Sequence, residues 1–230
     1  MPFLVIYFVF QSAFHMNEQQ QGLDTLQDIK RMMERSSRFI SLSGLSGIAA
    51  GICALTGAWF ANSVIAEHPG RLHETGPALQ DGISLRDFMG HSLFTIAALT
   101  FACAFVLAFL FTWLRTRKNG TPIWGTTSRR LLVSVALPMV AGGIFIFKLI
   151  QYGVYGLVAP GCLIFYGLAL VNGSKFTLGE VRWLGYGQVI LGIINLWWPG
   201  NGLYFWALGF GVLHIVYGAL MWWKYERTAD

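Results

Sequence analysis

The sequence predicts an all-α integral membrane protein, in which six transmembrane helices form three hairpins behind an amino-terminal amphipathic helix. The first observation is composition: 55% of the 230 residues are hydrophobic and 12% are charged, whereas soluble chains carry about 25% charged residues. The second is a set of six apolar runs, because a helix of about 20 apolar residues spans a hydrocarbon core of roughly 30 Å. The runs are Phe39–Ala61, Met89–Leu114, Leu131–Ile150, Tyr152–Val171, Trp183–Trp198 and Leu203–Trp223.

The third observation is the placement of basic and aromatic side chains around these runs. With the residues before the first run taken as cytoplasmic, 13 of the 16 Lys and Arg lie on the cytoplasmic side, and only Arg71, Arg86 and Lys148 do not. Because cytoplasmic loops retain positive charge, both termini are expected inside a bacterial cytoplasmic (inner) membrane. The net charge of +5 then gives no indication of nucleic-acid binding. All nine tryptophans lie at or just beyond the end of a run, where the amphipathic indole prefers the bilayer edge.

Residues 1–38 are expected to form a tail and a cytoplasmic amphipathic helix. Within residues 1–15, an apolar stretch lacks a preceding basic residue and is too short to span a bilayer, and Met16 then opens a polar segment. We interpret residues 1–15 as an upstream start extension or a weakly ordered tail, with a membrane anchor as the alternative. Apolar residues recur at three- and four-residue steps through Gly22–Arg38, which predicts a helix in the membrane interface or, alternatively, a docking or dimerisation helix.

The six-helix domain is expected to cover residues 39–223, followed by a cytoplasmic tail of residues 224–230. Its fifth run is the shortest, and needs the polar flank before Trp183 to complete a crossing. The one long external loop, residues 62–88, carries carboxylates together with two histidines that are five residues apart across a Pro-Gly pair. This spacing matches no recognised metal motif, so a solvated loop is preferred to a metal site.

A weak internal repeat relates the helices. Gly143-Ile144 followed by Phe147 is similar to Gly192-Ile193 followed by Leu196, and Tyr166-Gly167 is similar to Tyr217-Gly218. Glycines at such places let helix backbones approach closely. The GxxxG pair formed by Gly47 and Gly51 is likewise expected to serve packing inside the chain.

Residues 183–223, chiefly Gly192-Ile193, Leu196, Pro199 and Gly218, resemble small bacterial six-helix membrane proteins built from short glycine-containing repeats, among them an acid-resistance membrane protein family. The resemblance covers about a fifth of the chain and does not extend to the long external loop or to the amphipathic amino terminus. It implies a cytoplasmic-membrane protein with a stress-related role and no catalytic centre.

The distribution of charge excludes several kinds of chemistry. All 11 Asp and Glu lie outside the apolar cores, whereas proton relays usually use intramembrane acids and cation sites need oxygen ligands. The candidate intramembrane polar site consists of His214, Gln188, Asn195 and Lys148. Lys148 lies close to the outer headgroups, so snorkelling explains it better than a functional cation does.

His214 lies near the middle of the sixth run, and two roles for it stay open. A neutral imidazole bonded to Gln188 or to a backbone carbonyl would be structural, whereas a contact with substrate or with a moving proton would be functional. We expect the ring to be neutral, because no acid lies at its depth to balance a positive charge.

Two more specific hypotheses, a haem site and a serine protease, are not supported by the sequence. A bis-histidine haem would pair His91 with His214, but helical rise separates their depths by roughly 13 Å. The Gly44-Leu45-Ser46-Gly47 segment resembles the GxSG pattern of rhomboid proteases, yet the oxyanion histidine and asparagine of that family have no counterpart here. We therefore predict no catalytic residue, metal or cofactor.

Two function hypotheses remain. The first is a non-enzymatic protein of the lipid bilayer that acts through a partner membrane protein or as a homo-oligomer in envelope stress. The alternative is a small-solute or ion permease that uses the polar groups on the fifth and sixth predicted helices.

Overall fold

Every regular element in the described part of the chain is a helix, as the sequence predicts. The computed structural model describes residues 44–67, 92–118, 124–225 and 227. All of them belong to one compact unit, residues 39–230. No strand occurs among these residues. The predicted amphipathic helix, residues 1–15 and most of the predicted external loop lie outside them.

The helices follow the predicted apolar runs, with ends shifted by a few residues. They are α2 (Gly44–Glu67), α4 (Ser92–Lys118), α5 (Thr126–Gln151), α6 (Val158–Gly173), α7 (Val181–Asn195), α8 (Gly202–Trp206) and α9 (His214–Tyr225). Short 3-10 turns flank them at η1 (Tyr155–Leu157), η2 (Ser174–Phe176) and η3 (Pro199–Asn201), and a π-helical turn, η4 (Ala207–Leu213), joins α8 to α9.

Five helical segments are long and apolar enough to cross a membrane. They are Gly44–Ala66, Ser92–Lys118, Thr126–Gln151, Tyr155–Phe176 and Pro199–Tyr225. The chain is therefore an all-helical protein with five candidate membrane spans in its described residues. The fifth predicted crossing, at α7, has only 15 helical residues, which rise about 22 Å.

The early end of α7 has a local cause. The run Trp183–Trp198 predicts helix up to Trp198, but the helix ends at Asn195 and Trp198 adopts φ −130° and ψ 63°. Trp198 precedes Pro199, and a proline ring disfavours helical backbone in the residue before it. A crossing at α7 therefore needs its polar flank, and the six-helix topology stays a prediction.

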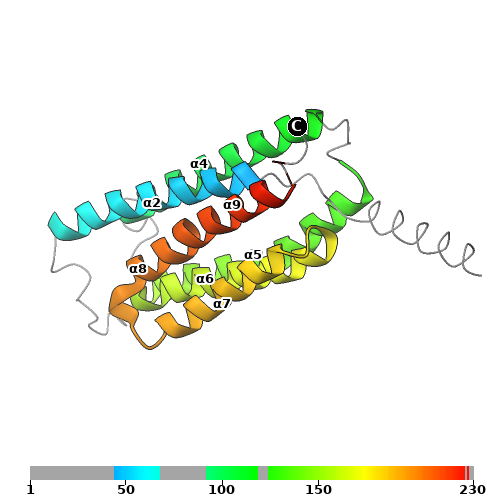
Figure 1. Cartoon of the computed structure of the whole chain (residues 1–230). Coiled ribbons are helices and arrows are strands. Elements are labelled where there is room, and N and C mark those ends of the chain that lie inside the picture. Colours follow the sequence, from blue (N-terminus) through cyan, green and yellow to red (C-terminus); the bar gives the residue numbers. More distant parts are fainter. Residues whose placement is uncertain (1–43, 68–91, 119–123, 226, 228–230) are drawn as a thin grey trace, which may run out of the picture. The chain divides into compact units, whose positions relative to one another are not determined.

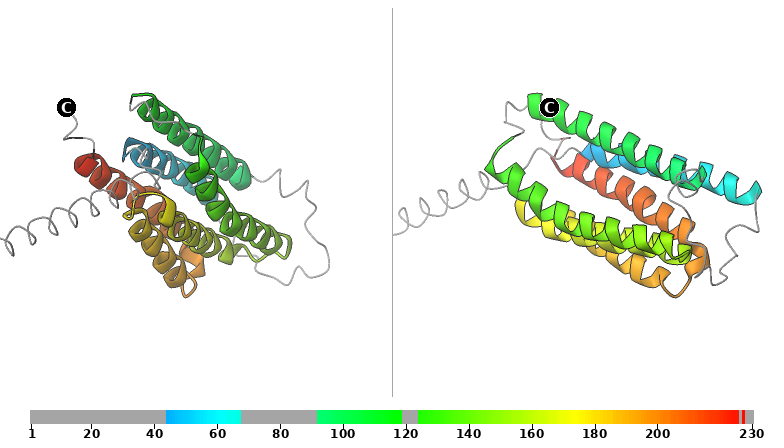
Figure 2. Two further views of the ribbon diagram at one scale, coloured as in Figure 1. Left: turned by 90° about the vertical axis from the view of Figure 1, so that its right-hand side faces the viewer. Right: turned by 180° about the vertical axis from the view of Figure 1, so that it is seen from behind.

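The helices pack in two neighbouring groups. α2 packs against α4 and α9, while α6 packs between α5 and α7. Figure 1 shows α2, α4 and α9 together, beside α5, α6 and α7, and the view from behind in Figure 2 shows the same grouping. The last crossing joins the groups, because α8 contacts α6 while η4 contacts both α2 and α7. Residues on η4 and at the start of α9 therefore lie where the two groups meet.

Glycines bring the backbones together at two of these interfaces. A Cβ atom built on Gly167 of α6 would lie 2.7 Å from the carbonyl oxygen of Gly185 on α7, and the reverse distance is 2.8 Å. On α2, a Cβ atom at Gly51 would lie 2.7 Å from the carbonyl oxygen of Gly211. The Gly47–Gly51 pair therefore packs inside the chain, as predicted. Gly143 has no neighbour within 4 Å of such an atom, so it does not share the packing role of Gly192, and the internal repeat stays a prediction.

Replacing Gly167 with leucine is expected to destabilise the α6–α7 pair, because the new side chain would meet backbone atoms that have no room to move. Overpacking of this kind costs about 1–3 kcal/mol. Thermal unfolding in detergent measures the loss. Gly143→Leu is the matched control, since its side chain would enter open space, and an equal loss in both variants would contradict the close packing.

Candidate functional site

A cluster of buried and half-buried polar side chains meets around His214, the first residue of α9. The hydroxyl of Tyr166 on α6 lies 2.8 Å from the His214 Nε2 atom, and the His214 Nδ1 atom lies 3.0 Å from the Gly209 carbonyl oxygen. Gln188 on α7 donates from Nε2 to the same carbonyl at 2.7 Å. Gln188 is 0% exposed and His214 is 6% exposed. Three helices and the π-helical turn thus share one hydrogen-bonded cluster.

These contacts determine the proton positions of a neutral cluster. A carbonyl oxygen only accepts, so the imidazole carries its hydrogen on Nδ1 and donates it to Gly209. The His214 Nε2 atom then accepts from the Tyr166 hydroxyl, and the carbonyl of Gly209 receives a second hydrogen bond from Gln188. A neutral His214 therefore has both ring nitrogens satisfied without a charged partner.

Both ring nitrogens of His214 have protein partners, which is the arrangement that its structural role would need. The partner carbonyl belongs to Gly209, on the same crossing as His214. The π-helical turn η4 separates the two residues, and π-turns are rare and frequently occur at functional sites. A larger residue at Gly209 would displace the Gln188 side chain, because a Cβ atom there would lie 2.6 Å from the Gln188 Oε1 atom.

Several buried polar atoms beside this cluster have no hydrogen-bond partner among the described residues. They are the Gln188 Oε1 atom, both amide atoms of Asn195 and the Tyr217 hydroxyl. Asn195 lies seven residues after Gln188 on the buried face of α7, about 10 Å further along the axis. Inside a membrane protein each such atom is costly, so a row of them requires an explanation.

Together with the cluster, these groups belong to a set of polar residues carried by α6, α7 and the last crossing. We call it the polar column. It consists of Glu180, Tyr217, Tyr166, His214, Gln188 and Asn195. Glu180 directly precedes α7 and Asn195 is its last residue, so about 22 Å of helical rise separates these two members of the set.

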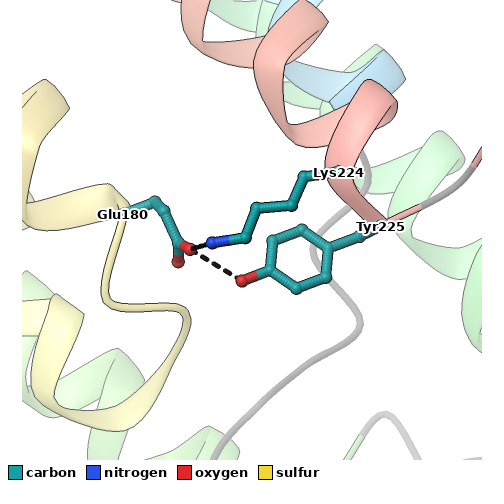
Figure 3. A network of polar contacts seen from close by, with 3 residues as sticks. All are labelled: Glu180, Lys224 and Tyr225. Atoms are coloured by element: carbon teal, nitrogen blue, oxygen red, sulfur yellow. Dashed lines mark hydrogen bonds and ion pairs between the residues drawn. The ribbon is translucent and has the colours of Figure 1, made fainter.

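Glu180 closes one end of the polar column. Its Oε1 atom accepts from the Lys224 Nζ atom at 2.5 Å and from the Tyr225 hydroxyl at 2.7 Å. Figure 3 shows both side chains reaching from the end of α9 to this one carboxylate. Partial burial raises the pKa of Glu180, but the hydrogen bonds from Lys224 and Tyr225 outweigh it and hold the pKa below the usual 4.5. The ion pair therefore fastens α9 to the beginning of α7.

This pair makes stability depend on pH in acid. Because the pKa of Glu180 is lowered in the folded state, its contribution is complete above pH 4.5 and is lost as the pH falls through the folded pKa. We expect Glu180→Gln to melt below the wild type at pH 7, with the two melting temperatures converging in stronger acid. The difference is small because solvent screens the exposed Lys224. A gap that stays constant from pH 7 to strong acid would contradict the assignment.

Lys148 does not belong to the site. It lies in the last turn of α5, is exposed and donates to the Gln151 Oε1 atom at 2.9 Å. The structure thus brings His214 and Gln188 together, places Asn195 two turns further along α7 and leaves Lys148 outside. This exposed position agrees with the snorkelling interpretation.

The alternative chemistries gain no support from this geometry. Both ring nitrogens of His214 already have partners, so neither is left to activate Ser46. His91 and the histidines of the predicted external loop lie outside the described residues. Within the described ranges, no group of three or more His, Cys, Asp and Glu side chains could hold a metal ion.

Sequence reasoning missed Tyr166 and the π-helical turn. Tyr166-Gly167 was informative only as part of the repeat with Tyr217-Gly218. The glycines of the segment ALGFGVL were the one available signal for an irregular turn, because glycine weakens a regular helix. No protein-family model, curated protein or solved structure matches the chain.

Proposed function

We propose that the chain is a six-helix protein of the bacterial cytoplasmic membrane, with both termini inside, that passes a small uncharged solute along the polar column. The basic residues support the orientation. Arg115, Arg117 and Lys118 end α4, Lys175 follows α6 and Lys224 ends α9. In Figure 1 these ends gather on one side with the beginnings of α5 and α7.

The observation that carries the proposal is Asn195, whose amide is 0% exposed and has neither atom partnered among the described residues. An amide group offers donors and an acceptor together. A polar solute or water molecule that passes along α7 would hydrogen-bond to the Asn195 amide and, at another point of its path, to the Gln188 Oε1 atom. A purely structural site would be expected to satisfy them with protein groups.

The chemistry of the polar column favours an uncharged solute. Glu180 is its only formally charged residue, and Lys224 already neutralises it at one end. Between Tyr217 and Asn195 the column offers hydroxyl, imidazole and amide groups, which hydrogen-bond well but do not balance an ion's charge. Uncharged polar solutes such as water, urea or glycerol fit this pattern better than ions do.

A swelling assay tests the proposal. Proteoliposomes containing the purified chain are mixed with water, urea or glycerol gradients, and permeability is followed by stopped-flow light scattering. We expect at least one solute to cross faster than in empty liposomes, and Asn195→Leu to remove most of the gain. The matched control is Thr56→Val, because Thr56 is exposed on α2 and hydrogen-bonds within its own helix.

The competing hypothesis is the non-enzymatic protein that acts through a membrane partner or a homo-oligomer in envelope stress. It rests on the sequence and its resemblance to the acid-resistance membrane proteins. The same assay separates the two hypotheses. Permeability at the level of empty liposomes for all three solutes would reject the permease and favour the partner-dependent protein.

A further inference from the structure

Two cysteines on neighbouring helices lie in contact, away from the polar column. The Cys53 Sγ atom on α2 lies 3.7 Å from the Cys103 Sγ atom on α4, although the residues are 50 apart in the chain. Both thiols are free. Figure 1 shows α2 and α4 side by side, and their packing brings these sulfur atoms together.

The register of α2 on α4 places the two cysteines beside each other. One turn along the same interface, a Cβ atom built on Gly57 would overlap the side chain of Thr100. Gly57 lies four residues after Cys53, and Thr100 lies three residues before Cys103, as an antiparallel pair requires. The close contact at Gly57 and the sulfur pair therefore report one register of α2 on α4.

We propose that Cys53 and Cys103 are a redox modification site, a dithiol that a membrane quinone oxidises to a reversible disulfide. The S–S bond is about 2 Å long, so the sulfurs need to approach by less than 2 Å. Two S–H bonds break and one S–S bond forms. The two electrons and two protons reduce the quinone to its hydroquinone, which balances the step.

The position of the pair fits a lipid-soluble oxidant. Cys53 is the tenth residue of α2 and Cys103 the twelfth of α4, so both lie deep within candidate membrane spans. The Cys103 side chain contacts Cys53 and is also exposed, so a lipid-soluble molecule could reach it. The third cysteine, Cys162, lies on α6 and is the internal control.

The disulfide would fix the position of α4 relative to α2. Among the described elements α4 packs chiefly against α2, so a covalent bond between the two helices would hold α4 at its main contact. The oxidised and reduced proteins would then differ in how freely α4 moves on α2. This inference does not rest on the proposed permease.

The test counts thiols before and after oxidation. Purified chain in lipid nanodiscs is treated with decylubiquinone, denatured and labelled with N-ethylmaleimide, and the number of labels is read from the intact mass. Reduced protein should take up three labels, one for each cysteine of the sequence. Oxidised protein should take up a single label, at Cys162, and dithiothreitol should restore the others.

A register control makes the result specific. A double variant combines Cys103→Ala with Ala102→Cys. It moves the thiol to the neighbouring position of α4, which is also exposed but is turned by about 100° around the helix axis. We expect the quinone to oxidise this variant at least tenfold more slowly than the wild type. The Cys53→Ser variant keeps two cysteines, and both should still be labelled after treatment with the quinone. Three labels on quinone-treated wild type, equal rates in the register variant or a covalent dimer would each overturn the proposal.

Discussion

Asn195→Leu is expected to make the protein more stable while lowering its solute permeability. The asparagine amide is fully buried and neither its oxygen nor its nitrogen has a partner among the described residues. Its desolvation therefore destabilises the folded state, and no hydrogen bond to the protein offsets this cost. Leucine has the same number of side-chain heavy atoms and no polar group. Removing an unsatisfied buried amide should therefore raise the free energy of unfolding by about 1–3 kcal/mol.

The matched control is an asparagine whose amide is used. Asn172 on α6 donates from Nδ2 to the Ser134 carbonyl at 2.7 Å, and its Oδ1 atom accepts from Lys175. Asn172→Leu should destabilise the protein by about 1 kcal/mol, the usual net value of a lost hydrogen bond. Thermal unfolding and the swelling assay are run on both variants. A destabilised Asn195→Leu would show that the amide has a structural partner and would remove the basis of the permease proposal.

The features that depend on composition and periodicity could be predicted from the sequence. Long apolar runs and terminal tryptophans predict helices that cross a bilayer, and the glycine pairs predict close backbone contacts. Gly47 and Gly51 do pack against the last crossing. Such features depend on one helix at a time or on the size of a single residue, so no partner has to be known in advance.

The features that depend on how helices are rotated against one another could not be predicted. Tyr166 is a core aromatic by pattern, and only the rotation of α6 against α9 brings its hydroxyl to the imidazole of His214. The Gly209 carbonyl is turned toward Gln188 and His214 at a π-helical turn, which regular helical spacing does not include. The early end of α7 is different, because the local effect of Pro199 on Trp198 could have been predicted from the sequence.

The His214 variants separate a structural histidine from a functional one. His214→Leu removes the acceptor for the Tyr166 hydroxyl and one donor to the Gly209 carbonyl, leaving a hydroxyl unpaired inside the bundle. We expect a loss of about 1–3 kcal/mol in the free energy of unfolding. His214→Gln keeps a donor and an acceptor and should unfold close to the wild type.

Tyr166→Phe supplies the second arm of a double-mutant cycle. The hydroxyl and the imidazole are partners at 2.8 Å, so removing both should cost less than the sum of the single losses, because no buried donor is left unpaired. The coupling energy is measured from the unfolding of the four proteins in detergent. Additive losses would show that the hydroxyl and the ring do not share a hydrogen bond. A His214→Leu variant with wild-type stability but no solute flux would instead assign the ring to transport, because the flux would then be lost without a loss of folding stability.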